Sequence, residues 1–247
     1  MMTPDEVKDT MRDHRWGRKN ALAYDAYRRL SRRKAWLGLL AGQLRGLVPG
    51  ARILEVGSGT GFITAILAEL GFAVDGVDLS PEMLVIAVRN LAAAGLDRRV
   101  RLFRGDAEAL EFGDGSFDAV VGRWVLWTLP RPARAIAEMA RVLKPGGLVV
   151  LVDGQHRPQG AWARRRGALV DWAITGRPLN WRETEYPRFW EGLPRLDARQ
   201  AAEVFTDLGL AVTTVQTGLE RQTDGLFFQW LQGGGWTSYL VKAVKPA

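Results

Sequence analysis

Cysteine is absent from the 247 residues, and histidine occurs only twice, at His14 and His156. The missing thiol excludes disulfides, thiolate metal ligands and a cysteine nucleophile. The two histidines stand alone in the sequence, with no cluster of ligands at metal-binding spacing around them. We therefore expect no metal site.

Long apolar runs are missing as well. No stretch reaches the roughly 18 apolar residues of a membrane-spanning helix, and residues 1–20 lack the apolar region of a secretory signal. Hydrophobic residues still make up 47% of the chain, which is enough for a sizeable core. We expect one cytoplasmic domain without a membrane span, as a monomer or homodimer.

The net charge of +7 is unevenly distributed. Residues 1–50 hold eleven Lys and Arg against five acids, and residues 157–199 hold nine Arg against five acids. A basic surface attracts nucleic acid or acidic small molecules, but solvated helix faces give the same count. Because no dense basic run accompanies the charge, we favour solvated faces and expect no nucleic-acid partner.

Strand-like and helix-like segments alternate between residues 50 and 153. We predict strands over 51–56, 72–79, 99–106, within 116–126 and over 148–153, with helices over 60–70, 80–94 and 132–143. This alternation is typical of βαβ units, and so of an α/β fold with a parallel sheet and helices on both faces. A leucine stripe predicts one helix over 21–48, and a helix over 198–208 with strands over 210–217 and 236–245 closes the chain.

Residues 154–197 break this regularity, and we interpret them as an insertion over the edge of the sheet. Four tryptophans in the insertion could form an aromatic wall for a planar or cationic acceptor, or bury a small core of its own: Trp162, Trp172, Trp181 and Trp190. The run Arg164-Arg165-Arg166 could receive a carboxylate or phosphate, or be a solvated helix face.

The stretch ILEVGSGTGF, residues 53–62, joins a buried-type strand to three glycines. In open α/β sheets, ligands bind beyond the carboxyl ends of the strands. Gly57, Gly59 and Gly61 would let the backbone turn sharply and approach a ligand, with a helix N-terminus aimed at it. The spacing is G-x-G-x-G, which is neither the dinucleotide fingerprint G-x-G-x-x-G nor a P-loop.

Acids accompany this loop. Asp78 ends the second predicted strand, where a carboxylate can accept hydrogen bonds from a ribose diol, and Asp106 ends the third, where it could face an adenine edge. Either could instead be an ordinary residue at the start of a helix. Glu55 lies inside the first strand, where a carboxylate in an apolar run needs a partner. Together with the glycines, these acids indicate a nucleoside-type site.

Four motifs in order resemble the class I S-adenosylmethionine-dependent methyltransferases, in particular the type 11, ubiquinone/menaquinone-methyltransferase-like subgroup. They are ILEVGSGTGF, VDGVDLSPEML, GDAEALEF and VLKPGGLVVLVD, all between residues 50 and 153. The resemblance implies a Rossmann-like seven-stranded sheet whose last strand, 236–245, is antiparallel. It divides the single domain into a helical N-terminal cap (1–49), a cofactor-binding core (50–153), an acceptor-side insertion (154–197) and a C-terminal helix with strands (198–247).

The resemblance also implies roles for single residues around S-adenosyl-L-methionine, whose product is S-adenosyl-L-homocysteine. The loop would wrap the methionine part, with Glu55 orienting it, and Asp78 would bind the ribose hydroxyls. Arg123 and Trp124 would lie beside the methionine end, and Tyr24, in NALAYD, would close over the cofactor. The complete set implied is Tyr24, Glu55, Gly57, Ser58, Gly59, Gly61, Asp78, Leu79, Met83, Gly105, Asp106, Ala107, Arg123 and Trp124, in which Leu79, Met83, Gly105, Asp106 and Ala107 surround the adenine.

The chain departs from the subgroup after the fourth strand. The subgroup commonly has a small polar residue and then a histidine there, whereas this chain has GRWVLWTL, with Arg123 and Trp127. The resemblance therefore carries no base over to this loop, and the acceptor need not be a quinone precursor. A hydroxyl acceptor would want a base, for which His14, His156, Tyr24, Tyr27 and Asp153 are the candidates. Of these, His156, Tyr24 and His14 are the predicted catalytic residues.

These patterns predict transfer of a methyl group to N, O or C of a small-molecule acceptor of aromatic or acidic character, by in-line displacement. An RNA or protein methyltransferase is an alternative that the net charge suggests. A non-catalytic module that binds S-adenosylmethionine is another.

Overall fold

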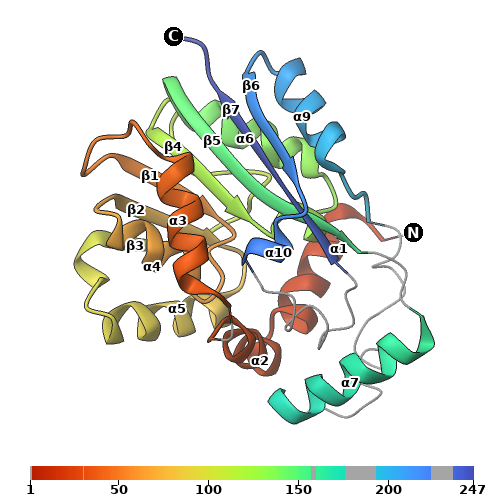
Figure 1. The fold of residues 1–247 in the computed structure, drawn as a ribbon. Helices are drawn as coiled ribbons and strands as arrows, with labels where there is room; N and C mark the ends of the chain where they lie inside the picture. Colours follow the sequence, from red (N-terminus) through yellow and green to blue (C-terminus); the bar gives the residue numbers. More distant parts are fainter. Residues whose placement is uncertain (1, 30, 157–159, 176–192, 224–235) are drawn as a thin grey trace.

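The computed structural model describes residues 2–29, 31–156, 160–175, 193–223 and 236–247. Seven strands form one mixed sheet in the order β3-β2-β1-β4-β5-β7-β6 (Figure 1). The strands are β1 (Arg52–Val56), β2 (Ala73–Asp78), β3 (Val100–Arg104), β4 (Phe117–Arg123), β5 (Leu143–His156), β6 (Ala211–Thr217) and β7 (Trp236–Val244). The first five strands are parallel, and β7 runs antiparallel to both β5 and β6, as the resemblance implied.

Helices surround the sheet. They are α1 (Pro4–Thr10), the π-helix η1 (Met11–Arg15), α2 (Arg18–Arg29), α3 (Arg33–Gln43), α4 (Phe62–Glu69), α5 (Pro81–Ala93), α6 (Pro132–Val142), α7 (Ala161–Thr175), α9 (Ala198–Asp207) and α10 (Glu220–Thr223), with the 3₁₀ turns η2 (Asp97–Arg99) and η3 (Leu126–Thr128). The predicted strands and core helices are thus present, with ends shifted by a few residues.

The two faces of the sheet follow from the alternation of side chains along each strand. In β1, Ile53 packs with α3 and α4 on one face, while Leu54 and Val56 pack with α6 and α9 on the other. Figure 1 shows α3 across one face and α6 behind the sheet. Two apolar layers therefore hold the central strands, and the ends of these strands are held in fixed positions.

One prediction about the N-terminal region is wrong. The single helix expected over 21–48 is two helices, α2 and α3, because the backbone leaves the helical region at Arg32, where φ is −73° and ψ is 78°. The two helices cover different surfaces: α2 buries Ala21 against α5, and α3 buries Trp36 and Leu40 against the sheet and α4. A straight helix could not reach both surfaces.

The structure describes residues 154–156, 160–175 and 193–197 of the expected insertion, whose place over the edge of the sheet stays a prediction. Strand β5 continues beyond residue 153 to His156, paired with β7. Helix α7 packs against α2 (Figure 1). Trp181 and Trp190 lie outside the described residues.

Candidate functional site

The sheet reverses its strand order between β1 and β4, and the glycine loop lies at the carboxyl end of β1. Gly57, Gly59 and Gly61 have φ of 75°, 54° and 84°, a region that L side chains rarely adopt. A Cβ on Gly57 would lie 3.0 Å from the Val125 side chain, and one on Gly61 would lie 3.3 Å from Ala87 of α5. The loop therefore needs glycine both for its turn and for its close packing.

Asp78, the last residue of β2, holds this loop in place. One carboxylate oxygen accepts a hydrogen bond from the Gly59 amide at 2.8 Å, and the other accepts one from the Ser80 amide at 2.9 Å. Burial raises the pKa of Asp78, and these amide bonds oppose the shift. Because each oxygen can accept a second bond, the carboxylate keeps capacity for a ligand.

Glu55 lies beneath the loop, fully buried in β1, and does not line the pocket. Thr64 of α4 donates its hydroxyl proton to the Glu55 carboxylate. Burial, the largest cause, raises the pKa of Glu55 to about 8, and the charge of Asp78 adds to the shift. Glu55 therefore links β1 to α4. Its role in orienting the glycine loop stays a prediction.

Asp106 is held by a residue that the sequence did not single out. Lys8 of α1 donates to Asp106 at 2.5 Å and lies 2.7 Å from a carboxylate oxygen of Glu108, which is fully buried. Arg131 reaches the same Glu108 carboxylate at 2.9 Å. The N-terminal helix is thus attached to the core by one lysine between two acids.

Arg123, at the end of β4, is buried among aromatic rings. Its guanidinium carbon lies 4.5 Å from the centre of the Trp36 ring and 5.7 Å from that of Phe62. One of its terminal nitrogens donates to the hydroxyl of Tyr24 at a long 3.4 Å. A cation is therefore fixed beside the glycine loop by stacking on aromatic faces.

The loop after β4 is positioned by Asp153, near the end of β5. Its carboxylate accepts hydrogen bonds from the amides of Leu126, at 2.6 Å, and Gly154, at 2.8 Å. Burial raises the pKa of Asp153 to about 7, against the opposing effect of these amides. Trp124 opens the loop with a φ of 56°, the only positive φ outside glycine in the described chain, and its ring lies over Gly154.

Aromatic side chains from the N-terminal region meet this loop. The Trp16 ring packs edge-on against Tyr24 at 5.7 Å and against Trp127 at 6.4 Å between ring centres. The Trp16 carbonyl accepts a hydrogen bond from the Ser80 hydroxyl at 2.8 Å, and the same hydroxyl accepts the amide proton of Met83 and so caps α5. The N-terminal region is therefore joined to the turn that follows Asp78.

These groups surround one pocket. The predicted residues that line it are Tyr24, Gly57, Gly59, Asp78, Leu79, Met83, Gly105, Asp106, Ala107, Arg123 and Trp124. Three predicted residues, Glu55, Ser58 and Gly61, do not line it. Residues that sequence reasoning missed complete the lining: Lys8, Met11, Trp16, Val77, Val125, Thr128 and Leu129.

The missed residues come from two places. Lys8, Met11 and Trp16 belong to a polar N-terminal segment. The helix signal in that segment was the pair Thr3 and Glu6, which forms a capping box for α1. The others belong to β2 and to the loop after β4, where the apolar run gave no indication of which side chains face the pocket. Asp153 was a candidate for a base from the sequence, whereas its hydrogen bonds to the loop after β4 were not predictable from the sequence.

The two histidines are placed only by their backbone. His156 ends β5, opposite Trp236 of β7, and His14 lies in η1. Their catalytic roles stay predictions, since their side chains are not described. On α7, Trp162 and Trp172 are exposed, so these two bury no core of the insertion.

No group of three or more metal-ligating side chains occurs among the residues that the structure covers. Within the same ranges, no helix is both long and apolar enough to cross a membrane.

Residues 54–151 match the family model of the type 11 methyltransferase domain. Over 132 residues the chain is 39% identical to a phosphatidylethanolamine N-methyltransferase of Cereibacter sphaeroides, covering 53% of this chain and 63% of that protein. Over 111 residues it is 40% identical to a demethylmenaquinone methyltransferase of Renibacterium salmoninarum, covering 45% and 44%. The chain thus matches less than two thirds of the length of either relative.

Solved structures share the fold. A phosphoethanolamine N-methyltransferase 2 of Haemonchus contortus has a TM-score of 0.73 at 19% identity, covering 100% of this chain and 61% of that one. The [4+2]-cyclase SpnF has a TM-score of 0.61 at 23% identity, covering 85% and 80%. At such identities the likeness concerns the fold alone.

The sheet order, the glycine loop after β1 and the acid ending β2 define a class I, Rossmann-like methyltransferase fold. Residues 54–151 match a methyltransferase domain of type 11, and over this part the chain is similar to the S-adenosylmethionine-dependent methyltransferases.

Proposed function

We propose that this chain transfers a methyl group from S-adenosylmethionine to N, O or C of a small-molecule acceptor. One observation carries the proposal: eleven of the predicted cofactor residues, from five separate segments of the chain, line a single pocket at the point where the strand order reverses. Ligands of open α/β sheets bind at such a point.

The residues present fit the donor. The loop of Gly57 and Gly59 brings bare backbone to the pocket wall, as close approach of the methionine part requires. The free acceptor capacity of Asp78 suits the two ribose hydroxyls. Arg123, fixed at the end of β4 and lining the pocket, would offer its positive charge to the methionine carboxylate.

When bound, the donor supplies a methyl carbon already activated by its sulfonium. The protein then has to orient the acceptor and keep water out. Met11, Trp16 and Trp124 form apolar and aromatic parts of the wall that can exclude water. An amine acceptor needs only to arrive neutral, whereas a hydroxyl acceptor would want a base.

Tyr24 is the catalytic candidate that the geometry favours. Its ring lines the pocket, it lies 3.7 Å from the position that a Cβ on Gly59 would take, and its hydroxyl contacts Arg123. Tyr24 can therefore contact both donor and acceptor. His156 and His14 stay second candidates for a proton acceptor.

The N-terminal region supports a small acceptor over an RNA or protein chain, because it covers part of the pocket. Lys8 of α1, Met11 of η1, Trp16, and Tyr24 of α2 all line the wall. The aromatic rings of Trp16, Tyr24 and Trp124 suit a planar or cationic acceptor. The names of the two relatives suggest an amine phospholipid and demethylmenaquinone as the first acceptors to test.

Binding of the donor is tested by calorimetry with S-adenosylmethionine. Asp78→Asn removes one acceptor oxygen and should weaken binding by about 1–3 kcal/mol, the cost of leaving a polar group of the ligand unpaired. Asp97→Asn, on an exposed residue outside the pocket, serves as the matched control and should bind as the wild type does. Equal affinity for both variants would refute the ribose assignment.

Transfer is tested separately, with methyl-labelled donor and a panel of amine, hydroxyl and quinol-type acceptors. Transfer of the label to any acceptor would support catalytic activity. In Asp78→Asn this transfer should be lost when the donor concentration is limiting. Tight donor binding without transfer to any acceptor or cell extract would favour the non-catalytic module instead.

A further inference from the structure

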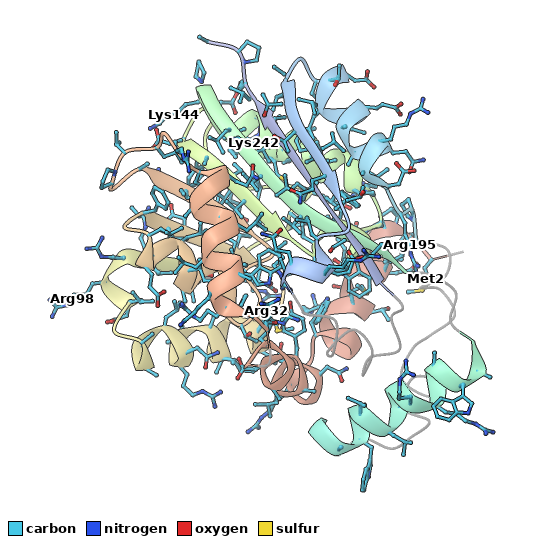
Figure 2. All side chains as sticks on the ribbon, viewed as in Figure 1. Met2, Arg32, Arg98, Lys144, Arg195 and Lys242 are labelled. Carbon is cyan, nitrogen blue, oxygen red and sulfur yellow. The ribbon has the colours of Figure 1, made fainter. Side chains whose placement is uncertain are left out.

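Helix α7 presents its large apolar side chains to solvent. Trp162 is 77% exposed, Leu169 55% and Trp172 56%. The spacings of seven and three residues bring all three to one stripe of the helix, with Arg165, also exposed, on the same stripe. Figure 2 shows side chains of α7 projecting away from the sheet.

The opposite side of α7 carries small residues. Gly167 is buried, Ala163 and Val170 are half-buried, and the helix packs against α2. Ordinary surface helices do the reverse and turn their large apolar residues toward the core. The stripe of Trp162, Leu169 and Trp172 is therefore left without a covering layer in the described chain, and a contiguous apolar surface of this kind marks an interaction site.

Charge indicates what this stripe meets. The sequence of α7 holds three arginines, Arg164 to Arg166, against one acid, Asp171, within a chain of net charge +7. Arg18, at the start of the neighbouring α2, is exposed as well. Tryptophan prefers the boundary between water and hydrocarbon, and arginine beside it suits the negative surface of an anionic bilayer.

We infer that α7 is an interfacial helix that lies on the surface of an anionic lipid bilayer, with Trp162, Leu169 and Trp172 in the headgroup region. Its 15 residues extend for about 22 Å, and length does not decide whether a helix lies in an interface. Attachment is peripheral, so it requires no membrane-spanning helix. The helix packs on α2, which carries Tyr24 into the pocket, and so the bilayer would lie next to the wall of the site.

The test is co-sedimentation of the full chain with vesicles, without methyl donor or acceptor, so that it is independent of the proposed activity. The wild type should sediment with vesicles of phosphatidylcholine and phosphatidylglycerol, weakly with phosphatidylcholine alone, and less as salt is added. Trp162→Ser/Trp172→Ser should lower the apparent partition coefficient by about tenfold or more, since insertion depends on buried apolar area.

A matched control comes from α5. Val85 and Val88 are 70% and 58% exposed on a different helix, so Val85→Ser/Val88→Ser removes a similar exposed apolar pair and should leave binding within about twofold. Thermal unfolding of both double variants verifies that each is folded. Arg165→Glu should weaken binding to the anionic vesicles only.

Three results would overturn the inference. The first is a wild type that binds no anionic vesicle. The second is equal binding by the wild type and the tryptophan double variant. The third is self-association that the tryptophan double variant abolishes without any lipid binding, in which case a second copy of the chain covers the stripe.

Discussion

At the scale of single residues, Glu55 ties stability to pH. Its pKa of about 8 in the folded chain lies far above the usual 4.5, with burial as the main cause. Between these values the folded state holds a proton that the unfolded state has lost. Stability therefore falls as pH rises, by about 1.4 kcal/mol per pH unit from this one group.

Glu55→Gln should remove this slope. The difference in free energy of unfolding between wild type and variant, measured in denaturant from pH 5 to pH 8, should change steadily in favour of the variant as pH rises. Glu111→Gln, on an exposed glutamate, provides the control and should give a flat difference. A flat difference for Glu55→Gln as well would mean that Glu55 ionises normally in the folded chain.

The sequence predicted that Glu55 needs a partner but could not say which. An acid inside an apolar strand is visible in the sequence, whereas its contact with Thr64 depends on how α4 turns back over β1. Asp106 shows the same limit. Its place at the end of β3 was predictable from local pattern, and its pairing with Lys8, 98 residues earlier in the chain, was not.

At the scale of elements, α1 depends on that lysine. Lys8 holds the helix to Asp106 and to buried Glu108, and Lys8→Met would leave both acids with one cation fewer. The free energy of local opening of α1 should fall by about 1–3 kcal/mol. Hydrogen exchange of the amides of residues 5–10 measures this opening directly.

Arg12→Ala is the control for this experiment, because the two acids with which Arg12 forms ion pairs, Asp9 and Asp13, are both exposed. Its effect on exchange should stay below about 1 kcal/mol. Similar exchange in the two variants would show that the Lys8 pairs do not hold the helix.

The loop after β4 and the end of β5 depend on each other through Gly154. A Cβ there would lie 2.4 Å from the Trp124 ring and 2.7 Å from the carbonyl oxygen of Thr237. Gly154→Ala should therefore cost about 1–3 kcal/mol of stability, as overpacking does. In a Trp124→Ala background the same change should cost less, by about 1 kcal/mol, with a remainder due to Thr237.

A double-mutant cycle in denaturant measures this coupling. Equal costs of Gly154→Ala in both backgrounds would show that the Trp124 ring does not press on Gly154.

The elements themselves were largely predictable from the sequence between residues 50 and 153. Strong period-two and period-3.6 patterns, with Ser80 and Pro81 opening α5, located each element to within a few residues. The pattern failed over 21–48, since one leucine stripe fits both a single long helix and two helices that cover different surfaces. Only the positions of α4 and α5 decide between them.

At the scale of the whole molecule, the pocket is lined by residues that lie far apart in the sequence, from Lys8 to Leu129. A ligand that contacts these residues together should stabilise the folded chain as a unit. S-adenosylhomocysteine at about 100 times its dissociation constant should add about 2.7 kcal/mol, which for a chain of this size raises Tm by roughly 5–10 °C. Thermal unfolding with and without the ligand measures the shift.

NAD provides the comparison for this shift, because the loop spacing differs from the dinucleotide fingerprint. It should leave Tm unchanged, and Asp78→Asn should reduce the shift given by S-adenosylhomocysteine. A larger shift with NAD would contradict the assignment of the pocket.

The pocket is built from two unlike parts of the chain. Most of its lining residues lie within residues 54–151, the part that matches the type 11 domain, while Lys8, Met11, Trp16 and Tyr24 line it from outside that part. Two proteins with the same lining from this domain can thus bind the same donor and differ in the acceptor that their N-terminal residues allow. Exchanging the first thirty residues between relatives would then change acceptor choice, and through Tyr24 and Lys8 it would also change donor affinity.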